Sequence, residues 1–148
     1  KVLAERDPDN VYADYFAELG RMVQNAEFDI VSHFDRILWR GTLLGLPFNL
    51  DKLEPTIRKT MGLIAQSGRA LELNTTFVTH SPGWLPALRT IFTWFYQEGG
   101  RRVVVNSDAH RAPEIGRHRA LAAEILTTAG FDIPAHLFQV GLVYEGVC

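Results

Sequence analysis

The chain has 148 residues and a formal net charge of -2, and 47% of its residues are hydrophobic while 22% are charged. This length corresponds to one domain, and this composition is typical of a folded domain and not of a disordered chain. The charge balance provides no general attraction to nucleic acid or to an anionic membrane, and no apolar run reaches the roughly 18 residues that a bilayer span needs. The single cysteine, Cys148, excludes an internal disulfide framework and a cysteine-based zinc finger. We therefore expect neither nucleic acid nor membrane as a partner.

Apolar spacing in the first third of the chain predicts an amphipathic helix over residues 12–25. A short apolar run at 28–32 predicts a strand, and His33 follows directly at its carboxyl end. Residues 41–50 combine Gly, Leu, Phe and Pro, which predicts a loop.

The next helix is predicted over residues 52–66, with Asp51 as its N-cap and Pro55 in its first turn. Gly68 is expected to end this helix, because glycine readily adopts the left-handed backbone found there. Residues 70–74 then predict a second strand.

A Ser-Pro-Gly turn at 81–83 precedes a predicted helix over residues 84–97. The clearest strand is 102–106, which contains three consecutive valines. A helix opened by Pro113 is predicted to run to about residue 129, and a last strand is predicted over 136–144.

Strands that alternate with helices in this way predict an α/β fold built of parallel βα units. A closed eight-stranded barrel needs about 250 residues, so four strands in 148 residues do not complete one. The chain is therefore either a small open α/β sheet or part of a barrel.

Polar side chains follow the predicted strands at the points where they end. His33, Asn74, Asp108 and His110 all lie at or just past such carboxyl ends. In α/β proteins ligands and catalytic groups gather at this edge of the sheet, so we expect these residues to converge there.

Asp108 and His110 are spaced two residues apart, which places both side chains on one side of an extended segment. Carboxylate and imidazole together can bind zinc, iron or manganese, and His33 is a candidate third ligand. The alternative is that Asp108 caps the next helix and His110 is an exposed loop residue.

Glu72 and Asn74 form a similar pair inside an apolar strand. Glu72 either orients a metal-bound histidine as a hydrogen-bond acceptor or lies solvated at a strand edge. Arg36 and Arg40 follow His33 and suit an anionic substrate such as a phosphate, although exposed surface arginines are common.

Four segments resemble motifs of the PHP superfamily and, within it, of the histidinol-phosphatase branch. They are FDIVSHFD at 28–35, LELNT at 71–75, VVNSDAH at 104–110 and PEIGR at 113–117. Their order and spacing agree with the family, and the resemblance runs from about residue 12 to about residue 143.

This resemblance implies a distorted (β/α)7 barrel that hydrolyses phosphate monoesters at a site containing two or three metals. It implies His33 and Asp108 as metal ligands and His110 as a ligand or as the catalytic proton donor. Glu72 and Asn74 would support the metal site, and a metal-activated water would attack phosphorus. Histidinol phosphate would be the small phosphorylated substrate, in cytoplasmic histidine biosynthesis.

The early H-x-H pair, a further histidine and a metal-binding glutamate of that family have no counterpart in this sequence, because residues 1–27 contain no histidine. We therefore expect residues 1–148 to form a single partial domain, the carboxyl-terminal part of such a barrel. Its partners would be the remaining amino-terminal half or a second copy of itself. The alternative functions are a phosphoesterase acting on nucleotides or other esters, and a non-catalytic fragment that binds a metal or a partner.

Overall fold

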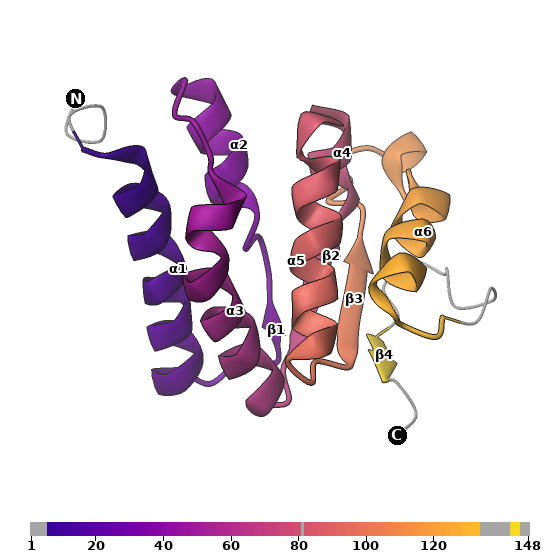
Figure 1. Cartoon of the computed structure of the whole chain (residues 1–148). Coiled ribbons are helices and arrows are strands. Elements are labelled where there is room, and N and C mark those ends of the chain that lie inside the picture. The colour runs from indigo at the N-terminus through magenta and orange to yellow at the C-terminus, as the bar shows by residue number, and fades with distance from the viewer. Residues whose placement is uncertain (1–5, 81, 134–142, 146–148) are drawn as a thin grey trace.

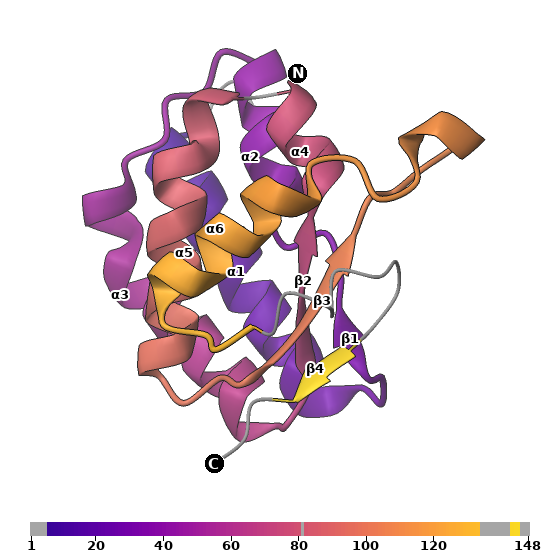
Figure 2. The same ribbon diagram turned by 90° about the vertical axis from the view of Figure 1, so that its right-hand side faces the viewer.

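The computed structural model describes residues 6–80, 82–133 and 143–145. A four-stranded sheet in the order β1-β2-β3-β4 lies beside a layer of helices, most of which gather on one face of the sheet (Figures 1 and 2). No helix in the described ranges is both long and apolar enough to cross a membrane. The elements in chain order are α1 (Pro8–Asn25), β1 (Ile30–Val31), α2 (Arg36–Leu43), α3 (Leu50–Gln66), β2 (Ala70–Asn74), α4 (Thr75–His80), η2 (Pro82–Trp84), α5 (Leu85–Gln97), β3 (Arg102–Asn106), η3 (Ala112–Glu114), α6 (Arg119–Ala129) and β4 (Val143–Glu145).

The first three strands are parallel, as the alternation of strands and helices predicts. Ile30 pairs with Ala70 between β1 and β2, and Asn74 pairs with Asn106 between β2 and β3. The carboxyl ends of these strands therefore lie at one edge of the sheet, where α2 and α4 begin (Figure 1).

The last strand corrects the expectation of parallel units throughout, because β4 pairs with β3 in the antiparallel direction. Strand direction at a sheet edge depends on the path of the preceding connection, which apolar periodicity does not encode. Most of the strand predicted over 136–144 lies outside the described residues.

The two faces of the central strands differ in chemistry. Leu71, Leu73 and Val103 belong to the hydrophobic core beneath the helices. Because side chains alternate along a strand, Glu72 and Asn74 lie on the opposite face, and both are buried. The sheet thus carries its polar groups on the face away from the helix layer.

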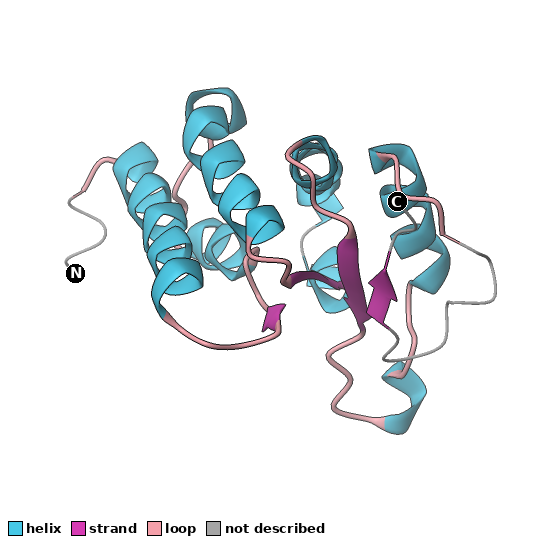
Figure 3. Cartoon of the chain, turned by 90° about the horizontal axis from the view of Figure 1, so that it is seen from below, coloured by secondary structure: helices cyan, strands magenta, loops and turns pink. Residues whose placement is uncertain are grey.

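The helix layer is held together by packing between neighbouring helices. Helix α3 packs against α1 and α5, and α5 also packs against α6 (Figure 3). The largest side chains buried between the layers include Tyr12, Phe16, Phe92 and Phe95. Burying each such side chain stabilises the fold by roughly 1.5–3 kcal/mol, so this layer holds the strands in register.

Two helix starts differ from the sequence prediction. Helix α1 begins at Pro8, where Asp7 caps it by accepting a hydrogen bond from the Asp9 N–H. Helix α3 is capped by Asn49 and not by Asp51, which lies in its first turn. Pro55 consequently lies inside α3, as its sixth residue and not in its first turn.

The regions next to the strand ends are more helical than predicted. Helix α2 (residues 36–43) includes residues 41–43, which were expected in the loop at 41–50. Helix α4 and η2 precede α5. The helix predicted from Pro113 is split instead, because Gly116 and His118 adopt left-handed backbone with φ of +71° and +56°. This left-handed backbone lets the chain change direction between η3 and α6.

Candidate functional site

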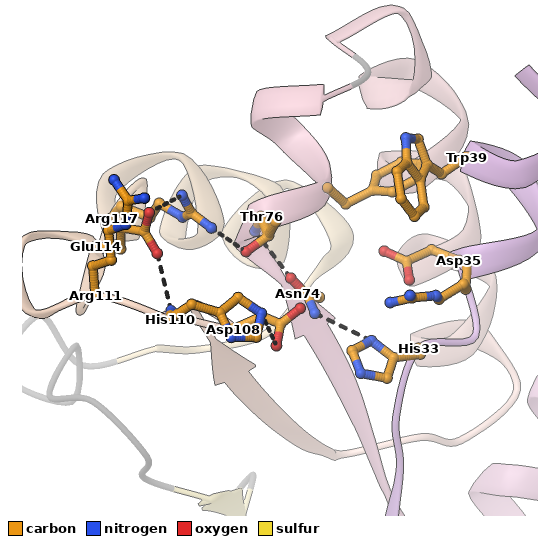
Figure 4. Close-up of a pocket in the computed structure, with 12 residues that line it drawn as sticks. His33, Asp35, Trp39, Asn74, Thr76, Asp108, His110, Arg111, Glu114 and Arg117 are labelled. Atoms are coloured by element: carbon orange, nitrogen blue, oxygen red, sulfur yellow. Dashed lines mark hydrogen bonds and ion pairs between the residues drawn. The ribbon is translucent and has the colours of Figure 1, made fainter. Parts of the chain in front are cut away.

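A pocket of about 450 Å³ opens at the carboxyl edge of the parallel strands (Figure 4). It collects residues from three segments that are distant in sequence. These are His33, Asp35, Arg36 and Trp39 after β1; Asn74 at the end of β2 with Thr76 and Phe77 after it; and Asp108, His110, Arg111, Glu114 and Arg117 after β3.

His33 lies on a sharp turn directly after β1, with a left-handed φ of +56°. Its N–H donates a 2.8 Å hydrogen bond to Glu72 Oε2, and its carbonyl accepts one from the Tyr15 hydroxyl at 3.1 Å. The His33 Nδ1 atom lies 3.3 Å from Asn74 Nδ2 and 3.6 Å from Glu72 Oε2. The strand-end network thus fixes both the backbone and the ring of this histidine.

Glu72 is the centre of that network. Its side chain is only 3% exposed, which excludes the alternative of a solvated carboxylate at a strand edge. One oxygen accepts from the His33 N–H, and the other accepts from Asn106 Nδ2 at 2.8 Å. Glu72 therefore joins the ends of β1 and β3 through β2, with a partner for each carboxylate oxygen.

Asp108 and His110 lie where β3 leaves the sheet. Asp108 also has a left-handed φ of +48°, and its N–H donates to Asn106 Oδ1 at 3.1 Å. His110 Nε2 lies 4.0 Å from Asp108 Oδ1, and the His110 side chain is 84% exposed. The His110 N–H donates to Glu114 Oε2 at 2.9 Å and lowers the pKa of that carboxyl. The pair is brought together, but the imidazole is open to solvent.

Three arginines line the pocket. Arg117 donates to the Thr76 hydroxyl and lies 3.9 Å from Glu114 Oε1, while its buried Nε has no hydrogen-bond partner. Arg36 stacks over Trp39, with its Cζ 5.4 Å from the ring centre. Arg111 lies beside Glu114 at the far side of the pocket (Figure 4). Guanidinium groups in one cavity favour a phosphate or a carboxylate.

Arg40, the other arginine suggested from sequence, does not line this pocket. It lines a neighbouring cavity of about 480 Å³, which shares His33 and Arg36 with the first pocket. Its guanidinium lies 4.9 Å from the Trp39 ring centre. The structure thus separates Arg40 from Arg111 and Arg117.

Asp35 is a second buried carboxylate, and its environment differs from that of Glu72. Its exposed fraction is 3%, and Oδ2 has no hydrogen-bond partner. Asp35 precedes α2 but forms no capping hydrogen bond with that helix. Burial, reinforced by the nearby Glu72 charge, raises the pKa of Asp35 to about 7. The pocket is therefore lined by a buried carboxylate with one oxygen, Oδ2, that accepts no hydrogen bond.

The sequence motifs suggest a metal ion, which His, Cys, Asp or Glu side chains would have to bind. Within the described ranges, no group of three or more His, Cys, Asp or Glu side chains is arranged to hold a metal ion. His33, Asp108 and His110 line one pocket but do not form a three-ligand cluster. The described residues alone therefore do not complete a metal centre.

No protein-family model and no curated protein matches the chain. Among solved structures, it is similar to a histidinol phosphate phosphatase from Lactococcus lactis subsp. lactis Il1403, crystallised with zinc, L-histidinol and phosphate. The TM-score is 0.68 at 17% identity, and the match covers 86% of this chain and 49% of that one. The chain has an α/β fold similar to about half of that phosphatase. At this identity the likeness establishes the fold alone.

Sequence reasoning identified His33, Asn74, Asp108, His110 and Arg36 among the residues that line the pocket. It assigned no role to the remaining lining residues. Two signals were present: an aspartate directly after the His33 turn, and arginines on both sides of the 112–116 segment. The residues without an assigned role were Asp35, Trp39, Thr76, Phe77, Arg111, Glu114 and Arg117.

Proposed function

We propose that the chain contributes to a phosphatase that hydrolyses a small phosphate monoester, with histidinol phosphate as its substrate. The observation that carries this proposal is the combination of arginines, imidazoles and carboxylates in one pocket at the carboxyl edge of parallel strands. The fold similarity to a phosphatase that was crystallised with L-histidinol and phosphate supports it.

The side chains of the pocket suggest a division of labour. Arg111 and Arg117 hold the phosphate oxygens, and Arg36 adds positive charge from the opposite side. Water adds to phosphorus while the ester P–O bond breaks, and His110 donates a proton to the leaving alkoxide and regains one from the water. Asp108, 4.0 Å from the His110 ring, orients the imidazole.

We propose that His33 and Asp108 are this chain's contribution to a shared site for zinc, manganese or iron, and that His110 would join them as a ligand only if it is not the proton donor. Glu72 and Asn74 hold His33 in place for that purpose, as hydrogen-bonded carboxylates and amides do around many metal ligands. Because the described residues lack a three-ligand cluster, the remaining ligands come from outside them.

The decisive test is release of inorganic phosphate from L-histidinol phosphate by the chain in the presence of zinc or manganese. Replacing His110 with alanine should remove the activity while the fold is kept. The matched control is His118→Asn, because His118 has a left-handed backbone that asparagine tolerates and lies outside the pocket. Equal activity of His110→Ala and wild type would remove His110 from the mechanism.

The metal proposal has its own test, zinc titration followed by calorimetry. The chain should bind zinc weakly, because residues 6–80, 82–133 and 143–145 lack a complete ligand set, and His33→Ala should abolish this binding. Unchanged zinc binding by His33→Ala would show that the metal is held elsewhere.

Binding without turnover is the second candidate, and the incomplete ligand cluster favours it. In that case the chain binds phosphate through its arginines but releases none from esters. Calorimetry with inorganic phosphate, run beside the activity assay, separates this candidate from the phosphatase.

We also propose that the chain pairs with a further half of such a barrel or with a second copy of itself. β1 lies at the edge of the sheet, and Ile30 on it and Met22 on α1 are 38% and 40% exposed. An open strand edge with apolar neighbours favours pairing with another strand. Light scattering should show species larger than 16.7 kDa, and a uniform monomer of that mass would contradict the proposal.

A further inference from the structure

The two ends of the pocket differ in chemistry. Arg111 and Arg117 lie with the Glu114 carboxylate on one side, while the buried Asp35 carboxylate lies on the other, next to Trp39 and the Arg36 guanidinium that stacks on it (Figure 4). A ligand that spans this pocket therefore meets two guanidinium groups at one end, and one guanidinium group with a buried carboxylate at the other.

One oxygen of the buried Asp35 carboxylate has no partner in the described part of the chain. Within the described ranges, its Oδ2 is the one buried carboxylate oxygen that lacks a hydrogen-bond partner. Aspartate before a helix commonly caps it, yet Asp35 has a helical φ of -82° and forms no capping bond with α2. A buried carboxylate oxygen without a hydrogen bond is costly, so Oδ2 points to a donor that arrives with a ligand.

Glu72 supplies the internal comparison. It is as deeply buried as Asp35 in the same part of the fold, and each of its oxygens has a protein donor. The strand ends can therefore satisfy a buried carboxylate, and they do so for Glu72 but not for Asp35.

We propose that Asp35 is a specificity residue, which accepts a hydrogen bond from a cationic nitrogen of the substrate while Arg111 and Arg117 bind its phosphate. This rests on the proposed phosphatase function and assigns to Asp35 the recognition of the substrate's amine.

The test is calorimetric titration of the full chain with L-histidinol, which carries the amine but no phosphate. Asp35→Asn should weaken binding roughly tenfold or more, because a charge-assisted hydrogen bond is lost, and should leave the affinity for inorganic phosphate unchanged. Arg117→Met should show the opposite pattern. Asp29→Asn, which changes an exposed carboxylate before β1, is the matched control and should affect neither ligand.

A deaminated analogue, imidazolepropanol, should bind wild type and Asp35→Asn equally. Equal histidinol affinity in wild type and Asp35→Asn, or no histidinol binding by wild type, overturns the inference. Asp35→Asn is expected to fold, since it removes an unpartnered charge from the interior, and circular dichroism checks this.

The outcome is separable from that of the proposed function. Phosphate release from L-histidinol phosphate with an Asp35-independent affinity for histidinol leaves the phosphatase standing and removes the specificity role. Asp35-dependent histidinol binding without any phosphate release supports the role of Asp35 and removes the phosphatase.

Discussion

The arginines at the two ends of the parallel sheet serve different purposes. At the amino end, Arg69 donates to the carbonyls of Val23, Ala26 and Phe28, and Arg102 donates to the carbonyl of Gly68. At the carboxyl end, Arg36, Arg111 and Arg117 line the pocket, and Arg117 retains a buried Nε without a hydrogen-bond partner.

The difference shows that side chains at one end of the sheet stabilise the fold, while side chains at the other end are available for a ligand. At the amino end, Arg69 and Arg102 donate to backbone carbonyls, so they fix the loops that lead into the strands. Donors and acceptors at the carboxyl end remain partly unused, which is the arrangement expected where α/β folds place their ligands. The comparison predicts that substitutions at the amino end mainly lower stability, while those at the carboxyl end mainly alter binding and pH dependence.

The largest effect is expected from Asp35, whose folded-state pKa of about 7 exceeds its ordinary value of 3.8. The folded chain therefore holds this proton more tightly than the unfolded chain does. Stability should fall as pH rises from about 4 to about 7 and level off above, by about 4 kcal/mol at most.

Urea unfolding of the metal-free chain across this range measures the effect. Asp35→Asn should remove this pH dependence and should be more stable than wild type at pH 8. Asp29→Asn is the control, because Asp29 is exposed. An unchanged profile in Asp35→Asn would show that the carboxylate is solvated or paired in solution.

Arg69→Ala tests the amino end. Three carbonyls lose their donor and the guanidinium contact with the Phe28 ring, 4.4 Å away, is lost as well. We expect a loss of about 3 kcal/mol in the free energy of unfolding, measured in urea, with no change in phosphate affinity. Arg21→Ala, which removes an exposed arginine of α1, should change stability by less than about 0.5 kcal/mol.

Glu72→Gln sharpens the comparison, since Glu72 is a carboxyl-end residue whose partners are all within the protein. An amide replaces one acceptor oxygen by a donor that faces either the His33 N–H or Asn106 Nδ2. Stability should fall by about 2 kcal/mol, as for an amino-end residue. Glu18→Gln, which changes an exposed glutamate of α1, is the control. Equal stability of the two variants would contradict the network described for Glu72.

The smallest stability effect is expected from Arg117→Met. The change removes a hydrogen bond to Thr76 Oγ1 and a 3.9 Å contact with Glu114, and it keeps much of the apolar stem. Unfolding should become easier by about 1 kcal/mol, whereas phosphate affinity should fall about tenfold. A large loss of stability with unchanged phosphate binding would place Arg117 among the structural arginines.

Elements with a clear local pattern could be predicted from sequence. Strands β2 and β3 have the predicted bounds, because continuous apolar and β-branched runs mark buried parallel strands. Helix α1 begins earlier than predicted, although Asp7 and Pro8 carried the start signal. Helix α4 could not be found this way, since Thr75 and Thr76 favour strands by propensity.

Only those residues of the candidate site that lie at predicted strand ends could be found from sequence. His33, Asn74 and Asp108 follow strands and could be placed at one edge. Asp35 could not be distinguished from an ordinary helix cap, because the lack of a capping bond is a property of the folded backbone. The strand register decides which donors reach the Glu72 carboxylate and which buried polar atoms have no partner. Residue type alone does not reveal this.

The hydrogen bonds that build the pocket join segments far apart in the chain. The bond from His33 to Glu72 spans 39 positions, that from Asn106 to Glu72 spans 34, and that from Arg117 to Thr76 spans 41. Parallel pairings of this separation form slowly, because the entropy of closing long loops is lost before the stabilising contacts form. The pocket therefore exists only once all three βα units have docked, and its ligands should slow unfolding while leaving the rate of refolding almost unchanged.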